Sequence, residues 1–187
     1  MCYRYRMNHD SYPDSYIRGI LNTVKTVAMV GFSPNTARPS YFVFKYLLER
    51  GFKVIPINPG HAGKEFLGQQ CYASLSEVPE PVDMVDIFRA PQFVTPVVEE
   101  ALKLSPKPQV IWMQLTIRND EAAALAEAAG LKVVMNRCPK IEYGRLSSEI
   151  SWMGINSRTL SSKRAQNLGG GFQRMGLGSA GDKAGKD

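Results

Sequence analysis

The segment from Thr26 to Gly60 constrains the fold of this chain more than any other. An apolar run, VAMV at 27–30, breaks at Gly31 into a turn of small residues, followed by a helical pattern and a second apolar run, Lys53–Ile57. This succession is the βαβ unit of a nucleotide-binding sheet. Its first turn directs free backbone N–H groups and a helix N-terminus at one point, where a phosphate is favoured. The segment therefore predicts a site for a phosphorylated nucleotide.

The rest of the chain repeats the alternation of strand and helix. Apolar runs predict five strands, at 26–30, 53–57, 83–88, 109–114 and 132–135, and helical patterns cover 10–24, 40–49, 93–104 and 119–129. The Gly- and Pro-rich stretch 58–82 is expected to be a loop with a short turn of helix. Strands that are apolar throughout are typical of parallel sheets buried on both sides. We predict an α/β fold: a single Rossmann-like, doubly wound parallel sheet with helices on both faces and strand order 3-2-1-4-5.

Composition divides the chain into a body and a tail. We expect residues 14–150 to form the domain and residues 151–187, which are basic and rich in Gly and Ser, to be a partly disordered extension. Of the net charge of +6, the residues after Gly154 carry +4, so the body is nearly balanced. The tail has only two aromatic residues, Trp152 and Phe172, among its basic residues, so nucleic-acid binding through stacked bases is disfavoured.

Other sequence features concern compartment and metal binding. No apolar run approaches the roughly 18 residues of a membrane helix, and the N-terminus lacks the pattern of a secretory leader. The three cysteines are widely spaced and form neither a disulfide framework nor a zinc pattern. We expect a cytoplasmic, reduced protein without a membrane span or a metal site.

Candidate ligand residues follow the strands, whose carboxyl ends meet at one edge of the sheet. Gly31 allows a sharp turn and close approach of a phosphate, and the Ser33 hydroxyl adds a donor. Arg38 and Ser40, the expected N-cap, flank the start of the helix, and Arg89 follows the third strand directly. For Gly31 the alternative is a plain βα turn without a ligand. For Arg38 it is a solvated charge on a loop, and for Arg89 a charge on the rim of the sheet.

The end of the second strand bears on the kind of nucleotide. Asn58 and Pro59 stand where a dinucleotide enzyme usually has Asp or Glu for the ribose hydroxyl, which argues against NAD. NADP is poorly supported, because the nearest cation is Lys64. Phe88 and Trp112 could stack on an adenine, although core packing is the alternative for both.

Reactive side chains are few. His61 lies in the Gly-rich loop, where a surface role is the alternative, and Cys138 has no neighbour in sequence that would lower the pKa of its thiol. Asp83 and Asp86 are three apart in a strand and therefore point to opposite faces, so they are not an acid/base pair. The residues alone indicate a binding protein more than an enzyme.

Seven motifs occur in order along the chain: GFSPN at 31–35, RPSY at 38–41, YLLERG at 46–51, INPG at 57–60, VDIFR at 85–89, VIWMQ at 110–114 and VVMNRCP at 133–139. Together, over residues 14–147, they closely resemble the small stand-alone CoA-binding proteins. These proteins are relatives of the N-terminal domain of the succinyl-CoA synthetase alpha subunit. The resemblance implies a Rossmann-like fold that holds CoA or an acyl-CoA across the carboxyl ends of the strands.

Carried over by motif, the resemblance places twelve residues along the ligand, with Gly31, Phe32 and Ser33 at the phosphates. The set is Gly31, Phe32, Ser33, Pro34, Arg38, Ser40, Asn58, Pro59, Phe88, Arg89, Ala90 and Gln114. The family usually has Gly in the motif Q-x-G-[IV], where this chain has Thr116. If that position requires a positive φ, Thr116 is strained and alters CoA affinity.

Two classes of function remain open. The first is a CoA or acyl-CoA binding protein without its own catalytic apparatus, acting with a protein partner or as a homo-oligomer. The second is an enzyme that acts on an acyl-CoA, with His61 or Cys138 as the reactive group. The larger relatives use a phosphorylated histidine in a second domain and an ATP-grasp partner, and we expect neither here.

Overall fold

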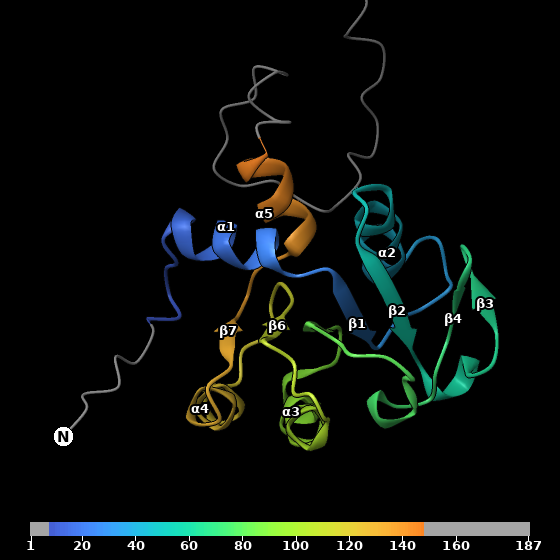
Figure 1. Ribbon diagram of the computed structural model, residues 1–187. Helices are drawn as coiled ribbons and strands as arrows, with labels where there is room; N and C mark the ends of the chain where they lie inside the picture. The colour runs from blue at the N-terminus through green and yellow to red at the C-terminus, as the bar shows by residue number, and fades with distance from the viewer. Residues whose placement is uncertain (1–7, 148–187) are drawn as a thin grey trace, which may run out of the picture.

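A computed structural model of the chain describes residues 8–147 (Figure 1). The predicted extension at 151–187, and with it the C-terminal boundary of the predicted domain, therefore lies outside the described residues. Five parallel strands form one sheet in the order β2-β1-β5-β6-β7. They are β1 Thr26–Val30, β2 Lys53–Ile57, β5 Met84–Ile87, β6 Val110–Met113 and β7 Lys132–Val134.

Helices cover both faces of this sheet, as predicted for the α/β class (Figure 1). One face carries α1, α2 and α5, and the opposite face carries α3 and α4. Their bounds are α1 Asp14–Thr23, α2 Pro39–Glu49, α3 Val94–Lys103, α4 Asp120–Ala128 and α5 Pro139–Leu146. None of the helices in residues 8–147 has the length and apolarity required to cross a membrane.

The predicted strand order, 3-2-1-4-5, is wrong. The third strand of the main sheet, β5, pairs with β1 on the side away from β2, so the order is 2-1-3-4-5. The connection from β2 to β5 explains the difference, because Leu75 and Val82 pack into the core on the α3 and α4 face. In a right-handed crossover, a connection on the face opposite α2 carries the next strand in the opposite direction. The reversal of strand order, where ligands bind in such sheets, therefore lies between β1 and β5.

The connecting segment 58–82 contains more regular structure than the predicted loop. A short hairpin, β3 Glu65–Phe66 with β4 Gln69–Gln70, lies between two 3₁₀ turns, η1 Pro59–His61 and η2 Leu75–Glu77. A third such turn, η3 Pro91–Phe93, precedes α3, and α5 was not predicted at all. The N-cap of α4 is the expected Asn119, whose side chain accepts a hydrogen bond from the Ala122 N–H at 2.8 Å.

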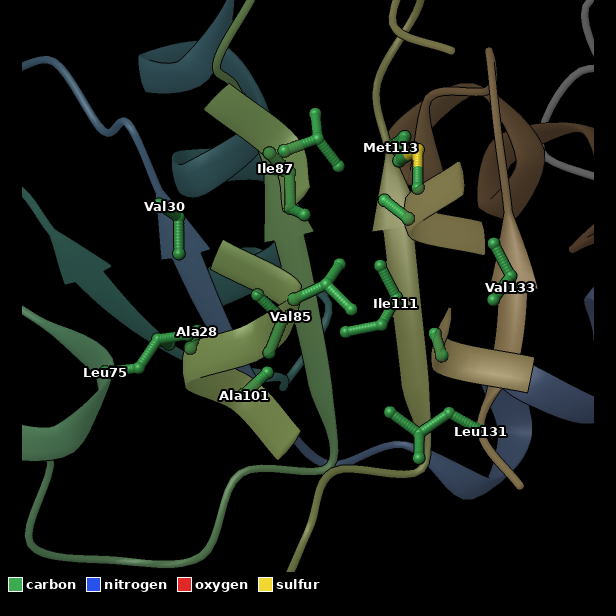
Figure 2. Packing of buried hydrophobic residues seen from close by; sticks show 14 of the residues in the cluster. Ala28, Val30, Leu75, Val85, Ile87, Ala101, Ile111, Met113, Leu131 and Val133 are labelled. Carbon is green, nitrogen blue, oxygen red and sulfur yellow. The ribbon is translucent and has the colours of Figure 1, made fainter. Parts of the chain in front are cut away.

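The core on the α3 and α4 face is aliphatic (Figure 2). The strands contribute buried residues at alternate positions, among them Val85 and Ile87 of β5 and Ile111 and Met113 of β6. On the other face, the core includes Phe32, Phe44 and Trp112 together with other aromatic side chains. The five-stranded sheet is therefore buried on both sides, which fixes the carboxyl ends of its strands relative to one another.

Candidate functional site

The carboxyl ends of the strands surround a groove of about 770 Å³. All twelve residues placed there by motif line it except Pro34 and Pro59. Seven further lining residues are not among these twelve. They are Pro39, Val43, Pro91, Leu115, Thr116, Ile117 and Cys138. Leu115 and Ile117 directly follow β6, where the rule that selected Gln114 also places them.

Gly31 forms the sharp turn at the end of β1. Its φ is +86°, and a Cβ at this position would lie 2.5 Å from the backbone oxygen of Phe88. Its N–H donates to the Ile57 oxygen of β2 at 3.0 Å. The glycine thus allows the chain segments that follow β1 and β5 to approach each other closely, at the point where the strand order reverses.

The turn offers fewer free amides than the sequence indicated. The Ser33 N–H donates to the Ser40 Oγ at 3.1 Å, and the Asn35 N–H donates to the Ser33 Oγ at 3.4 Å. Among residues 31–35, the Phe32 N–H has no acceptor within the part of the chain that the structure describes. The hydroxyl proton of Ser40 likewise has no described acceptor. Residues 31–35 therefore leave one described amide for an anion, beside the Ser40 hydroxyl.

Two predicted site residues serve mainly to hold this turn in place. The Phe32 side chain is fully buried, with its ring centroid 4.8 Å from that of Phe44 and 5.1 Å from that of Phe66. Asn58 donates from Nδ2 to the Phe32 oxygen at 2.7 Å, and its Oδ1 accepts from the Gly60 N–H at 2.8 Å. Phe32 therefore presents its backbone to the groove, and both ends of the Asn58 amide are engaged.

Ser40 is not the N-cap that the sequence suggested. Arg38 occupies that position, and α2 begins at Pro39. Because Ser40 lies one residue inside the helix and is buried, its hydroxyl reaches back to the Ser33 N–H. This contact ties the turn after β1 to the first turn of α2.

Two cations stand at the groove without an acidic partner. Arg38 and Arg89 are both exposed, and neither forms an ion pair with a carboxylate in residues 8–147. The Arg89 guanidinium lies 6.0 Å from the centre of the Phe93 ring. By contrast, Arg118 and Arg145 each pair with two carboxylates. The charge at the groove is therefore available to an anionic ligand.

A buried carboxyl group lies beneath the groove. Asp86 of β5 is fully buried, and the Gln114 Nε2 lies 2.9 and 3.0 Å from its two oxygens. Burial raises the pKa of Asp86 to about 8, an effect that the hydrogen bond from Gln114 opposes. Asp83 lies three residues earlier in the chain, where its Oδ2 accepts from the Lys25 and Thr26 N–H groups at the other edge of the sheet. The two carboxyl groups are thus separate, as predicted.

The reactive groups considered from the sequence have different positions. Cys138 lines the groove, but burial raises the pKa of its thiol to about 11, which disfavours the nucleophilic thiolate. His61 is not among the lining residues, and its ring lies edge-on to Phe66. Trp112 is buried and donates from Nε1 to the Arg137 oxygen at 2.8 Å, so it serves the core. Within residues 8–147, no three His, Cys, Asp or Glu side chains are arranged to hold a metal ion.

Comparison with known proteins identifies the family. A family model described as "CoA binding domain" matches residues 25–144, most of the part that the structure describes. The chain belongs to this CoA binding domain family. The uncharacterized protein YneT of Bacillus subtilis is 34% identical over 127 residues, which are 68% of this chain and 91% of YneT.

A solved structure and a larger enzyme extend the comparison. A hypothetical protein from Pyrococcus horikoshii OT3 has 38% identity and a TM-score of 0.69, covering 77% of this chain and 99% of its own. Acetate–CoA ligase (ADP-forming) I of Archaeoglobus fulgidus is 28% identical over 147 residues. These residues are 74% of this chain but only 21% of the ligase, so the chain matches one part of that enzyme.

Thr116 departs from the motif of the family resemblance as the sequence indicated. Its φ is +68°, a conformation that a β-branched residue adopts with strain. Its N–H donates to the Asn136 Oδ1 at 2.8 Å, and Asn136 has a positive φ of +53°. The position therefore needs the left-handed conformation, and Thr116 adopts it while lining the groove.

Proposed function

We propose that this member of the CoA binding domain family binds CoA or an acyl-CoA in the groove at the carboxyl ends of its strands. The observation that carries the proposal is the pair of guanidinium groups, Arg38 and Arg89, which have no carboxylate partner within residues 8–147 and stand beside a turn closed tightly by Gly31. A pyrophosphate at this turn would accept hydrogen bonds from the Phe32 N–H and the Ser40 hydroxyl. The rest of the ligand would extend along the groove towards Ala90 and Gln114.

The size and chemistry of the groove support a ligand with both charged and apolar parts. Its lining combines the two arginines with Val43, Leu115 and Ile117. Phe88 is half-buried, packs against the core and lines the groove, and its ring would offer a stacking surface to an adenine. A phosphorylated nucleotide with a long, weakly polar arm matches this combination better than a simple nucleotide does.

Isothermal titration with CoA tests the proposal, and adenosine serves as the matched ligand without phosphates. We expect CoA to release heat and saturate the protein at micromolar concentration, whereas adenosine binds far more weakly because it lacks the anionic groups. No heat with CoA at high micromolar concentration, from protein that circular dichroism shows to be folded, would disprove the proposal.

The alternative function is an enzyme that acts on acyl-CoA, and the position of Cys138 in the groove favours it over any role for His61. The raised pKa of the Cys138 thiol opposes it. Incubation with several acyl-CoAs, followed by mass spectrometry, separates the two proposals. Free CoA released in the wild type but not in Cys138→Ala would establish an enzyme; unchanged acyl-CoA supports a binding protein.

A further inference from the structure

The buried carboxyl group of Asp86 has no role in the binding just described, although it lies directly under a groove residue. Asp86 is on the central strand β5, between Met29 of β1 and Trp112 of β6. Its neighbours at alternate positions assign it to the face covered by α1, α2 and α5, because Met84 belongs to that core and Val85 to the other. Burial of an unpaired charge is strongly unfavourable, so the presence of an acidic side chain in this core needs a structural or functional explanation.

The hydrogen bonds of Asp86 determine how the Gln114 side chain is oriented. Both carboxylate oxygens accept from the Gln114 Nε2. An ionised carboxylate has only lone pairs to offer, so it holds the NH₂ end of the amide and repels the carbonyl oxygen. Gln114 lines the groove and is only 5% exposed, so its carbonyl oxygen is the end left on the groove side.

Protonation of Asp86 reverses this preference. A protonated carboxyl group carries one O–H donor, and the Gln114 carbonyl oxygen is the acceptor within reach. If the amide turns over to accept this proton, its NH₂ end faces the groove instead. The same side chain can therefore present either an acceptor or a donor to a ligand.

We propose that Asp86 is a positioning residue whose protonation state sets the orientation of the Gln114 amide, and through it the hydrogen-bonding character of the groove floor. The inference rests on the proposed function in one respect, that CoA occupies the groove. The protonated state binds CoA more tightly, because the NH₂ group meets the oxygens of the ligand and no buried negative charge lies under the groove that holds this anionic ligand.

Few other ionisable groups act on Asp86 within residues 8–147. The Cys138 thiol, just before α5, is the group whose pKa Asp86 raises, and it stays neutral at moderately alkaline pH. Apart from Arg18, which is exposed and acts on Asp14, the other charged side chains on α1, α2 and α5 pair among themselves or contact an aromatic ring. These contacts are Asp14 with Arg145, Glu142 with Arg145, Lys45 with Glu49, and Lys140 over the Tyr46 ring. Titration between pH 7 and pH 9 therefore reports on Asp86, whose pKa of about 8 lies between those limits.

The first test measures CoA affinity at pH 7 and pH 9 for the wild type, Asp86→Asn and Gln114→Met. We expect the wild-type affinity to fall roughly tenfold as the pH rises, and the fall to be absent in Asp86→Asn. The ligand's own ionisations affect both proteins equally. Gln114→Met keeps the charge of Asp86 but removes the amide. The logarithm of its fall in CoA affinity between pH 7 and pH 9 should therefore be at most half that of the wild type. A fall of the same size in Asp86→Asn, or an undiminished fall in Gln114→Met, would overturn the proposal.

The second test needs no ligand and no substitution at Asp86. In the wild-type protein, the ¹H–¹⁵N signals of the Gln114 side-chain amide should shift between pH 7 and pH 9 with a single midpoint. The carboxyl ¹³C signal of Asp86 should titrate with the same midpoint. Amide signals that stay constant while Asp86 titrates would overturn the proposal. If CoA does not bind at any pH, the proposed function fails, and this titration still decides whether Asp86 positions Gln114.

Discussion

The two ends of the same parallel strands are built differently. At the amino ends, backbone groups are paired across neighbouring strands: the Lys53 N–H donates to the Lys25 oxygen, and the Lys132 N–H to the Gln109 oxygen, each at 2.9 Å. Asp83 completes this edge by accepting from two further N–H groups, also at 2.9 Å. At the carboxyl ends, the Phe32 N–H and the Ser40 hydroxyl proton have no described acceptor, and two arginines have no described acidic partner.

This difference separates stability from binding within one sheet. Polar groups that are paired inside the protein hold the strands in register, but they have nothing left to offer a ligand. Groups left without a partner at an exposed edge contribute little to folding and can be satisfied by a ligand. We therefore expect substitutions of the paired groups at the amino ends to change stability alone, and substitutions of the unpaired groups at the carboxyl ends to change binding.

The largest effect is expected for Gly31→Ala at the carboxyl end of β1. The new Cβ would meet the Phe88 oxygen, and the alanine would have to adopt a positive φ. We therefore expect the unfolding free energy to fall by about 4 kcal/mol and CoA binding to become unmeasurable. Gly130→Ala is the matched control, because Gly130 has a φ of +88° but nothing within 4 Å of its Cβ position. It should lose only about 1 kcal/mol and bind CoA normally. Urea unfolding and titration calorimetry measure both, and equal losses would refute the close approach at Gly31.

The next effect concerns Asp86 and the pH dependence of stability. The pKa of Asp86 is raised from 3.8 to about 8, so between these values the folded protein binds one more proton than the unfolded chain. The unfolding free energy therefore falls as the pH rises through this range, by several kcal/mol in total. Asp86→Asn should remove this part of the pH dependence. Unfolding curves at pH 5 and pH 8.5 test it, and identical pH dependence in the two proteins would show that Asp86 is ionised throughout.

Asp83→Ala tests the amino ends of the strands. Two N–H groups would lose their acceptor, which should lower the unfolding free energy by about 2 kcal/mol. CoA affinity should stay within about a factor of two, since Asp83 lies at the opposite end of the strands from the groove. A large loss of CoA affinity in protein that remains folded would contradict the assignment of stability to the amino ends of the strands and of binding to their carboxyl ends.

Arg89→Ala tests the carboxyl ends of the strands in the same way. Removal of a cation that has no acidic partner among the described residues should weaken CoA binding about tenfold and leave the melting temperature within a few degrees. Lys132→Ala removes an exposed cation from the amino end of β7 and should change neither quantity. Equal CoA affinity in Arg89→Ala and the wild type would mean that Arg89 is only a rim charge.

The smallest effect is expected at Thr116. Thr116→Gly relieves the strain of a positive φ, partly offset by the greater freedom of glycine in the unfolded chain, for a net gain of about 0.5 kcal/mol. Thr116→Ala keeps a Cβ in the same conformation and should gain less. CoA affinity should rise slightly in Thr116→Gly, because the groove widens. Denaturant unfolding decides the order, and greater stability in the alanine variant would contradict it.

Local patterns were sufficient for much of the fold. Apolar runs located all five strands of the main sheet to within one residue at either end, and the Asn119 cap marked the start of α4. α5 was missed because its sequence, PKIEYGRL, has a weak apolar stripe and an internal Gly. The β3–β4 hairpin was missed because each of its strands has only two residues.

The candidate site was predicted with similar but uneven success. The rule that ligands gather at strand ends found Gly31, Arg89 and Gln114, which line the groove together. The number of free amides at the turn was overestimated, because the Ser33 N–H is taken by Ser40 seven residues later. The inclusion of Cys138 in the lining depends on how α5 packs, which no local pattern records.

The sequence by itself determined where strands and helices lie, that the sheet is parallel, and that Thr116 stands where the resembled family has glycine, because these depend on periodicity and on the identity of single residues. Only the tertiary structure decided that β5 lies beside β1 and that Asp86 is buried under Gln114. Strand order depends on which face the connection from β2 packs against, and the state of a buried acid depends on neighbours distant in sequence. The strand order and the state of Asp86 both depend on packing between residues far apart in sequence. Patterns among neighbouring residues therefore do not predict them.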